Sequence, residues 1–166
     1  MKMTTKSAVG TSMLALALGL ASQVNADEPS YSFDPGVACS FGLDVYVSNC
    51  NEHRVLKTFT DGYGNIVRML SAGKGCDLDY VNTSTDATYW TKADGSVSHT
   101  SYNSDGSQTV AATGHNVLVF YPGDIPSGPS TTQYVGRVVY TIDTDGTWIL
   151  EKVAGRRVDI CAALSE

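Results

Sequence analysis

Apolar and polar residues alternate with a period of two along most of the chain. Between residues 37 and 47 the odd positions are apolar, and small or polar residues separate them. Successive side chains of a strand point to opposite faces, so this alternation indicates a half-buried β-strand. No segment of ten or more residues shows a convincing helical stripe. The sequence therefore predicts an all-β protein.

Segments with similar strand character recur about every ten residues. Asp-Gly pairs occupy several of the connectors and accept the positive φ angles of tight hairpin turns. Together with the first segment they predict an antiparallel meander of about nine to eleven short strands. The further predicted strands are 54–60, 66–71, 77–81, 87–93, 96–102, 108–113, 116–121, 132–142, 147–153 and 157–164.

A meander of this size leaves two strand edges exposed unless the sheet closes. Closure into a barrel removes the edges, whereas a sandwich only shortens them. We therefore expect one antiparallel up-and-down β-barrel of calycin-like build over residues 37–166, preceded by a polar lead at 27–36.

The first 26 residues have the pattern of a secretory signal peptide. Lys2 and Lys6 precede an apolar stretch at 8–21, and Val24-Asn25-Ala26 fits the small-x-small cleavage rule. That stretch is shorter than the roughly 20 residues that span a bilayer. We expect cleavage before Asp27, secretion to the extracellular space and no membrane span in the mature chain.

The charge of the mature chain argues against nucleic-acid binding. The full chain has a net charge of −6, and removal of Lys2 and Lys6 leaves 9 basic and 17 acidic residues, a net charge of −8. An acidic chain repels phosphate backbones, and Arg156-Arg157 is its only basic pair.

Four cysteines lie in the predicted mature chain, and an even number in an exported protein indicates two disulfides. A zinc site is disfavoured because the chain has no C-x2-C pair. Three pairings are possible. We favour Cys39–Cys161 with Cys50–Cys76, because the first bond would place the first and last predicted strands side by side.

Three stretches carry a resemblance: 38–47 (ACSFGLDVYV), 112–124 (ATGHNVLVFYPGD) and much of 136–164. They resemble a widespread group of small, uncharacterised exported bacterial β-proteins, which implies location and architecture and no chemistry. Members of that group tend to have one cysteine near each end, which supports the Cys39–Cys161 pairing. In strand number the chain is also similar to calycin-like and allene-oxide-cyclase-like barrels, a likeness of fold only.

The histidines are the first candidates for chemistry, because imidazole titrates near neutral pH. His99 lies mid-strand and could face a barrel interior, His115 lies in a bend at the expected barrel mouth, and His53 is expected to be exposed. No H-x-H or H-E-x-x-H spacing occurs, so neither a metal nor a cofactor is expected. For each histidine the alternative is an ordinary surface or polar-core residue.

Acidic residues form two close pairs. Asp77 and Asp79 share one face of a predicted strand and could point into a lumen, as a glycosidase pair would. The alternative places both in solvent, with Leu78 facing the core. The other pair, within 143–146, resembles a truncated calcium loop but lacks further ligands, which favours a hairpin turn.

Aromatic residues are frequent, with nine tyrosines and two tryptophans. They could be cross-strand pairs that stabilise the sheet. Alternatively they form a stacking platform for sugars or line a small-ligand cavity. The candidate ligand-binding residues are Tyr80, Tyr89, Trp90 and Tyr102.

The leading hypothesis is a monomeric binding or surface-interaction protein whose partner is a small apolar ligand, a saccharide or a protein. It rests on a stable scaffold without a nucleophile motif such as G-x-S-x-G. One alternative is a cyclase- or isomerase-type barrel enzyme acting on a small apolar substrate through His99 with Asp79 or a nearby tyrosine. Another is a protease inhibitor that uses the proline-rich loop 122–132 to bind the protease. The alternative for this loop is that it only forms part of the barrel rim.

Overall fold

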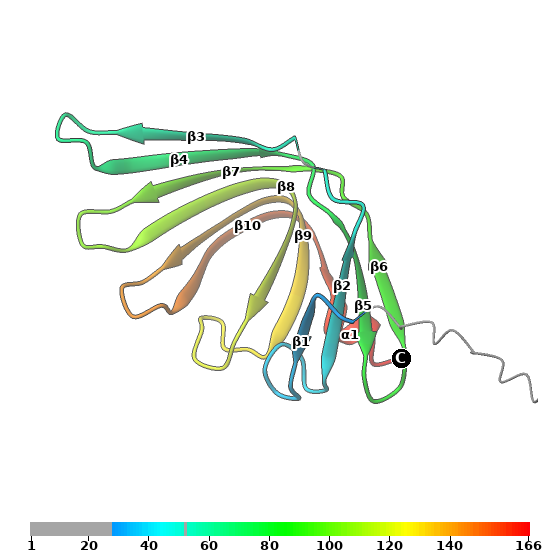
Figure 1. The fold of residues 1–166 in the computed structure, drawn as a ribbon. Coiled ribbons are helices and arrows are strands. Elements are labelled where there is room, and N and C mark those ends of the chain that lie inside the picture. The colour runs from blue at the N-terminus through cyan, green and yellow to red at the C-terminus, as the bar shows by residue number, and fades with distance from the viewer. Residues whose placement is uncertain (1–27, 52) are drawn as a thin grey trace, which may run out of the picture.

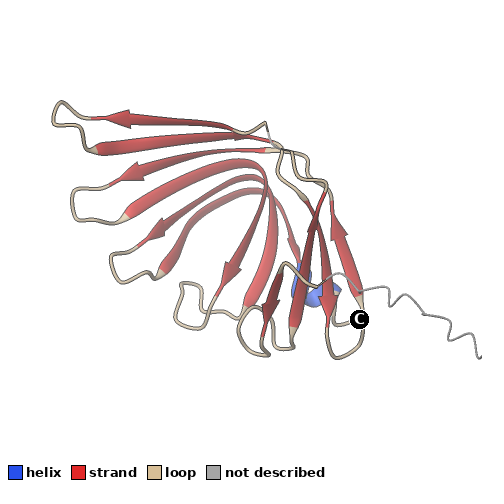
Figure 2. Ribbon diagram, viewed as in Figure 1, coloured by secondary structure: helices blue, strands red, loops and turns tan. Residues whose placement is uncertain are grey.

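The computed structural model describes residues 28–51 and 53–166, which form ten antiparallel strands and one short helix (Figure 1; Figure 2). The predicted signal peptide, 1–26, lies outside these residues. No helix in the described part has the length and hydropathy to cross a bilayer. The elements are β1 (Tyr31–Phe33), β2 (Leu43–Ser48), β3 (Val55–Thr60), β4 (Ile66–Gly73), β5 (Asp77–Asn82), β6 (Thr88–Thr91), β7 (Ser96–Tyr102), β8 (Gln108–Phe120), β9 (Ser130–Ile142), β10 (Trp148–Asp159) and α1 (Ile160–Ala163).

The strands form two open sheets, so the expected single closed barrel is wrong. The first sheet has the order β1-β2-β5-β6 and the second β10-β9-β8-β7-β4-β3. The chain passes between the sheets after β2, β4 and β6, so the predicted consecutive meander is wrong there as well. β2 and β5, which precede and follow the β3–β4 hairpin in the chain, pair with each other in the first sheet. β4 and β7, which precede and follow the β5–β6 hairpin, pair with each other in the second sheet.

Three glycines bend the second sheet, two of them, Gly114 and Gly155, where the sequence predicted breaks between strands and one, Gly136, inside the predicted strand 132–142. Gly114 of β8 lies opposite Gly136 of β9, which lies opposite Gly155 of β10, and all three have positive φ angles, of 96°, 130° and 124°. A Cβ at any of them would lie less than 3 Å from a backbone carbonyl oxygen of the neighbouring strand. The strands therefore continue through this line, here called the crease, and curve sharply there (Figure 1).

Beyond the crease, one three-stranded segment separates two hydrophobic cores. Its Val117 and Val119 pack against the first core, which includes Leu43, Tyr80 and other residues of the first sheet. Alternate residues of the same segment belong to the second core, which lies inside the bend of the second sheet. The fully and partly buried members of that core are Ala112, Leu118, Phe120, Tyr134, Val138, Tyr140, Trp148, Leu150 and Val153.

Both ends of the domain differ from the predicted strands. The polar lead contains β1, which pairs with β2, whereas residues 37–42 form a turn in which Cys39 is fully buried. At the other end β10 stops at Asp159, whose carboxylate accepts a hydrogen bond from the Ala162 amide at 2.9 Å and caps α1. Cys161 therefore lies in a helical turn, and its predicted place in the last strand is wrong.

Both predicted disulfides, Cys39–Cys161 and Cys50–Cys76, are present. The first lies in the first core and ties the turn before β2 to the helix after β10. Thr131 of β9 reinforces this junction, because its hydroxyl donates a hydrogen bond to the Ala38 carbonyl at 3.0 Å.

We predict that Gly136→Ala destabilises the protein by about 3 kcal/mol, through strain at positive φ and a clash with the Ala154 carbonyl. Gly146 has positive φ but open surroundings, so Gly146→Ala should cost about 1 kcal/mol. Gly62→Ala, also in open space, should change stability by less than about 0.5 kcal/mol. Urea unfolding measures all three, and equal losses at Gly136 and Gly146 would show that close approach at the crease does not matter.

The two disulfides should contribute unequally to stability, because they close loops of different length. Their cysteines are 122 and 26 residues apart, respectively. We predict that Cys39→Ala with Cys161→Ala costs about 4–5 kcal/mol and Cys50→Ala with Cys76→Ala about 3 kcal/mol. Urea unfolding of the two double variants checks the order, which a larger loss for the second pair would contradict.

Candidate functional site

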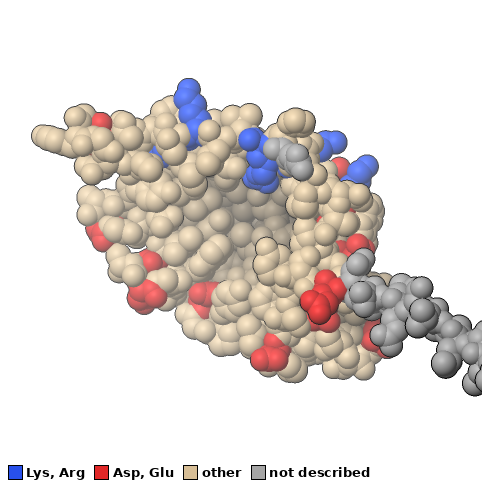
Figure 3. Space-filling model, in the orientation of Figure 1, with Lys and Arg blue, Asp and Glu red and all other residues tan. Residues whose placement is uncertain are grey.

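A hollow of about 440 Å³ opens between the two sheets near Ser96, the first residue of β7. β7 pairs with β8 only as far as Ser96 opposite Gly114, and β8 then continues paired to β9 alone. The other edge of β8 therefore faces the hollow over residues 115–118, and the space-filling view shows the concavity between the two sheets (Figure 3).

The walls of the hollow are mixed in polarity. β2 and β5 contribute Val47 and Leu78, and β8 contributes Val117 and Leu118. Small residues leave the space open on the side of the second sheet. Polar residues from the described walls are Thr91, Ser96, Ser98, His115, Asn116 and Gln133.

Asn116 carries an unpartnered polar group in this wall. Its side-chain Nδ2 is buried and has no hydrogen-bond partner among the described residues. An amide group buried without a partner costs about 1–3 kcal/mol relative to one that is hydrogen-bonded. The hollow therefore presents a donor that a bound acceptor would satisfy.

His115 and Asp94 form the second polar feature. The Nδ1 atom of His115 lies 3.2 Å from Oδ2 of Asp94, and the two side chains are 27% and 50% exposed. The two atoms are close enough for an ion pair, but their geometry is not that of a hydrogen bond. The contact is therefore an ion pair only while the imidazole is protonated.

The border of the hollow carries basic charge. Arg54 and Lys92 both line it, and both are exposed. The acid Asp94 is exposed in the same lining, so the charged side chains there are two cations and one anion. Together with the apolar Leu78 and Val117, this excess of positive charge suits a molecule with an anionic end and an apolar body.

Of the predicted catalytic residues, only His115 lies at the hollow. His99 is exposed and paired with Leu70 and Ala111, on the face of the second sheet opposite its buried residues, so the predicted interior position is wrong. Asp79 alternates with Leu78 and Tyr80, both of which pack in the first core. The enzyme hypothesis therefore loses the pair of residues on which it rested.

The candidate aromatic residues are not brought together. Tyr80 and Tyr89 pair within the first core, with ring centroids 6.5 Å apart. Trp90 is 54% exposed and is paired with Asp79 on the other face of that sheet. Tyr102 belongs to the second sheet, so the predicted stacking platform does not form.

The proline-rich loop 122–132 is held against β10. The buried Asp124 carboxylate accepts hydrogen bonds from the Tyr121 and Trp148 amides, at 2.6 and 2.9 Å. Ile125 donates to the Trp148 carbonyl and accepts from the Leu150 amide. The loop thus closes one side of the second core, and its predicted use in protease inhibition stays a prediction.

The remaining acidic and histidine candidates have ordinary surroundings. Asp145 caps its hairpin turn by accepting from the Thr147 amide, and hydrogen bonds from Thr147 hold the pKa of Asp145 below its usual value. His53 is exposed beside the Cys50–Cys76 disulfide. Within residues 28–51 and 53–166, no three histidine, cysteine or acidic side chains are grouped to hold a metal ion.

Asn116 was missed by the sequence analysis, although the sequence contains a signal for it. It stands two residues before Leu118 and four before Phe120, on the apolar side of an alternating strand. A polar residue at such a position is either hydrogen-bonded or functional. The positions of Ser98 and Ala112 in the hollow could not be predicted from the sequence, because small residues are common both in strands that line a cavity and in strands that do not.

Comparison with family models, curated proteins and solved structures finds no match to this chain. The resemblance to small exported bacterial β-proteins therefore stays a prediction, and the site is interpreted from its own geometry.

The buried Tyr80 predicts how stability depends on pH. Burial raises the pKa of Tyr80 from 10.0 to about 12. Between these two values the unfolded chain loses the phenolic proton while the folded protein retains it. The stabilisation is therefore complete below pH 10 and is lost as the pH rises to about 12.

We predict that Tyr80→Phe retains about 2 kcal/mol more of its neutral-pH stability at pH 12 than the unmodified protein does. Tyr31→Phe, at a side chain that is 61% exposed, is the matched control and should follow the unmodified protein. Urea unfolding at neutral and alkaline pH measures the difference. Identical pH profiles for Tyr80→Phe and the unmodified protein would contradict the assignment.

Proposed function

We propose that the protein binds a small amphipathic ligand with an anionic or acceptor-bearing end in the hollow beside β8. The observation that carries this proposal is the buried, unpartnered Nδ2 of Asn116. A hydrogen-bonded partner would remove the cost of burying that amide. The volume of about 440 Å³ falls within the usual range of small-molecule sites.

The residues that line the hollow support this ligand class. Arg54 and Lys92 at the border attract an anionic group. Val47, Leu78 and Val117 accept an apolar body, and Asn116 offers a donor to any acceptor on it. Of the aromatic residues, Tyr31 and Tyr140 line the hollow, whereas Tyr80, Tyr89, Trp90 and Tyr102 do not.

The setting of this activity is an exported protein. Two disulfides persist in oxidising compartments, and the predicted signal peptide and group resemblance support the same location. We propose that the protein acts outside the cell as a binding protein, with the disulfides maintaining the two sheets around the hollow.

The first experiment fills the hollow and follows an anionic amphipathic probe, 1-anilinonaphthalene-8-sulfonate. Ser98 lines the hollow on β7, whereas Ser101 is exposed on the opposite face of the same strand. We predict that Ser98→Phe reduces probe affinity at least about tenfold, since the new ring occupies the binding volume. Ser101→Phe adds an equal ring outside the hollow and should leave affinity unchanged.

Fluorescence titration of both folded variants gives the affinities. Unchanged probe binding in Ser98→Phe would reject the hollow as the site.

A second experiment asks whether the Asn116 amide is retained for binding. We predict that Asn116→Leu stabilises the ligand-free protein by about 1 kcal/mol, because it removes a buried amide without a partner. Urea unfolding measures this, with Asn103→Leu as control: Asn103 donates hydrogen bonds to Ser107 and Thr109, so its loss should destabilise. A stability loss for Asn116→Leu as large as that for the control would make the amide structural and remove the argument.

A further inference from the structure

The β3–β4 hairpin extends from the second sheet as an exposed apolar arm, defined here as residues 54–74. One edge of β3 has no neighbouring strand among the described residues. The arm holds five of the eleven large hydrophobic side chains that are exposed on the described protein, although it spans only 21 residues. These are Val55, Leu56, Tyr63, Ile66 and Val67, with exposures of 60%, 65%, 94%, 49% and 40%.

Charge on the arm is opposite to that of the rest of the protein. The arm contains four basic residues and one acid, a net charge of +3. The other described residues contain five basic and 14 acidic residues, a net charge of −9. In Figure 3 basic side chains gather over the upper part of the molecule, whereas acidic ones surround the lower hairpins. The basic residues of the arm are Arg54, Lys57, Arg68 and Lys74.

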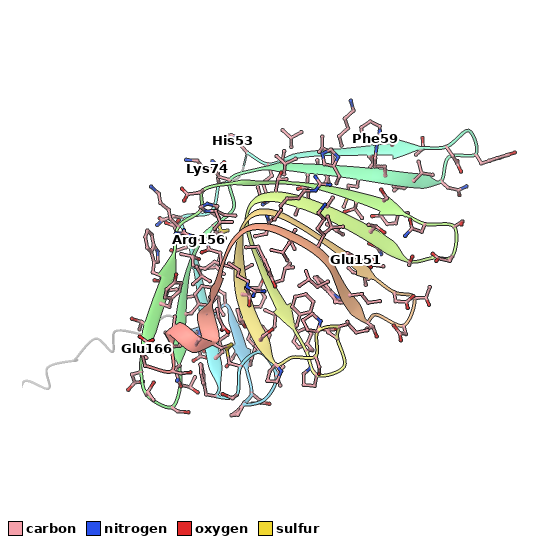
Figure 4. All side chains as sticks on the ribbon, turned by 180° about the vertical axis from the view of Figure 1, so that it is seen from behind. His53, Phe59, Lys74, Glu151, Arg156 and Glu166 are labelled. Atoms are coloured by element: carbon pink, nitrogen blue, oxygen red, sulfur yellow. A yellow bond between two sulfur atoms is a disulfide. The ribbon has the colours of Figure 1, made fainter. Side chains whose placement is uncertain are left out.

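The apolar and basic residues of the arm are arranged in order from its tip. Tyr63, Ile66 and Val67 lie at or next to the turn. Behind them, the Lys57 Nζ and Arg68 Cζ atoms lie 5.2 and 4.3 Å from the Phe59 ring centroid. Figure 4 shows Phe59 on the outer side of the arm, away from the bend of the sheet. The arm thus has an apolar tip with a basic collar.

The one acid of the arm is engaged within the turn. The Asp61 carboxylate accepts hydrogen bonds from the Tyr63 and Asn65 amides, at 2.8 and 2.9 Å, and from the Asn65 side chain. These bonds, the Asn65 side chain first, lower the pKa of Asp61. Asp61 therefore remains ionised, and the net charge of +3 for the arm already includes it.

The other three hairpin connections of the second sheet, residues 103–107, 121–129 and 143–147, contain acidic residues and no lysine or arginine. Exposed large hydrophobic side chains do occur there, with Tyr121 and Ile125 in the β8–β9 connection and Tyr102 next to the β7–β8 turn, but no basic residue lies in these connections. The pattern is therefore a property of the arm and is not a general feature of exposed hairpins here.

We propose that the arm docks the protein onto an anionic lipid surface, with Tyr63, Ile66 and Val67 entering the interface. Apolar side chains flanked by lysine and arginine bind such surfaces by joining apolar burial to headgroup attraction. A second copy of this chain is a poorer occupant, because symmetric pairing of two β3 edges would bring the Lys57 side chains of both copies onto adjacent strands. This inference is independent of the hollow.

The test is flotation of the purified, disulfide-bonded protein with vesicles of phosphatidylcholine, with or without phosphatidylglycerol. We expect binding to the anionic vesicles at low salt and at least tenfold weaker binding to neutral ones. Tyr63→Ser with Val67→Ser should abolish binding. Trp90→Ser, at an exposed aromatic of the first sheet, should leave it unchanged.

Matched charge reversals separate the local collar from the overall charge. Lys57→Glu with Arg68→Glu and Lys152→Glu with Arg156→Glu alter the net charge equally, and all four side chains are exposed. Only the first pair should lower vesicle binding, by at least about tenfold. Equal losses in both double variants, or binding that survives the serine substitutions, would overturn the proposal.

Two further measurements complete the test. Ser98→Phe should bind vesicles normally, so failure at the hollow and failure at the arm are distinguishable. Sedimentation without lipid should show a monomer at all concentrations tested. Absence of vesicle binding would overturn docking on lipid. A dimer that is lost in the Tyr63→Ser with Val67→Ser variant would also overturn it, and would show that the arm binds a second copy of the chain.

Discussion

Backbone-to-backbone contact between glycines at the crease is the constraint on which the second sheet depends. Gly136 lies between Gly114 and Gly155 on adjacent strands, and each approaches a neighbouring backbone more closely than a side chain would allow. β8, β9 and β10 bend together at the crease. The part of the sheet beyond the crease, which includes Val117 and Val119, therefore packs against the first core, whereas the part on the other side curves over the second core. The same bend leaves one side of β8 without a partner and thereby opens the hollow.

Beyond the crease, β8 and β9 have buried or partly buried side chains on both of their faces, whereas most of β10 there is exposed. Parallel sheets are commonly buried in this way, whereas an antiparallel sheet usually leaves one face to solvent. Here Val117 and Val119 serve the first core and Leu118 and Phe120 the second. Asn116 lies on the same strand face as Leu118 and Phe120, and its side-chain Nδ2 has no hydrogen-bond partner within the described protein.

Strand content could be predicted from the sequence, because alternation is a local property. The predicted strand 96–102 has the bounds of β7, and 54–60 differs from β3 by one residue. The disulfide pairing was also predicted. The interleaved hairpins could not be predicted, because alternation of β3 does not specify which sheet it joins. Gly114 and Gly155 were interpreted as breaks, since a glycine has the same sequence signal in a turn as in a bent strand. Asn116 was identifiable as unusual. Its relation to a hollow depends on β7 beginning at Ser96, so that β8 has no neighbour on that edge beyond Gly114, and the sequence does not show this.

The position of the final helix has a consequence for the order of events during folding. Ile160 and Leu164 are fully buried in the first core together with Ala38 and Leu43, which lie near the opposite end of the described chain. The first core therefore forms only when segments more than 100 residues apart in the sequence meet, as the Cys39–Cys161 bond with its separation of 122 residues also shows. Contacts of such long range are slow to form, because the entropy of closing a long loop must be lost before they contribute. The hairpins of the second sheet need only short-range contacts, so we expect them to form before the first core is complete.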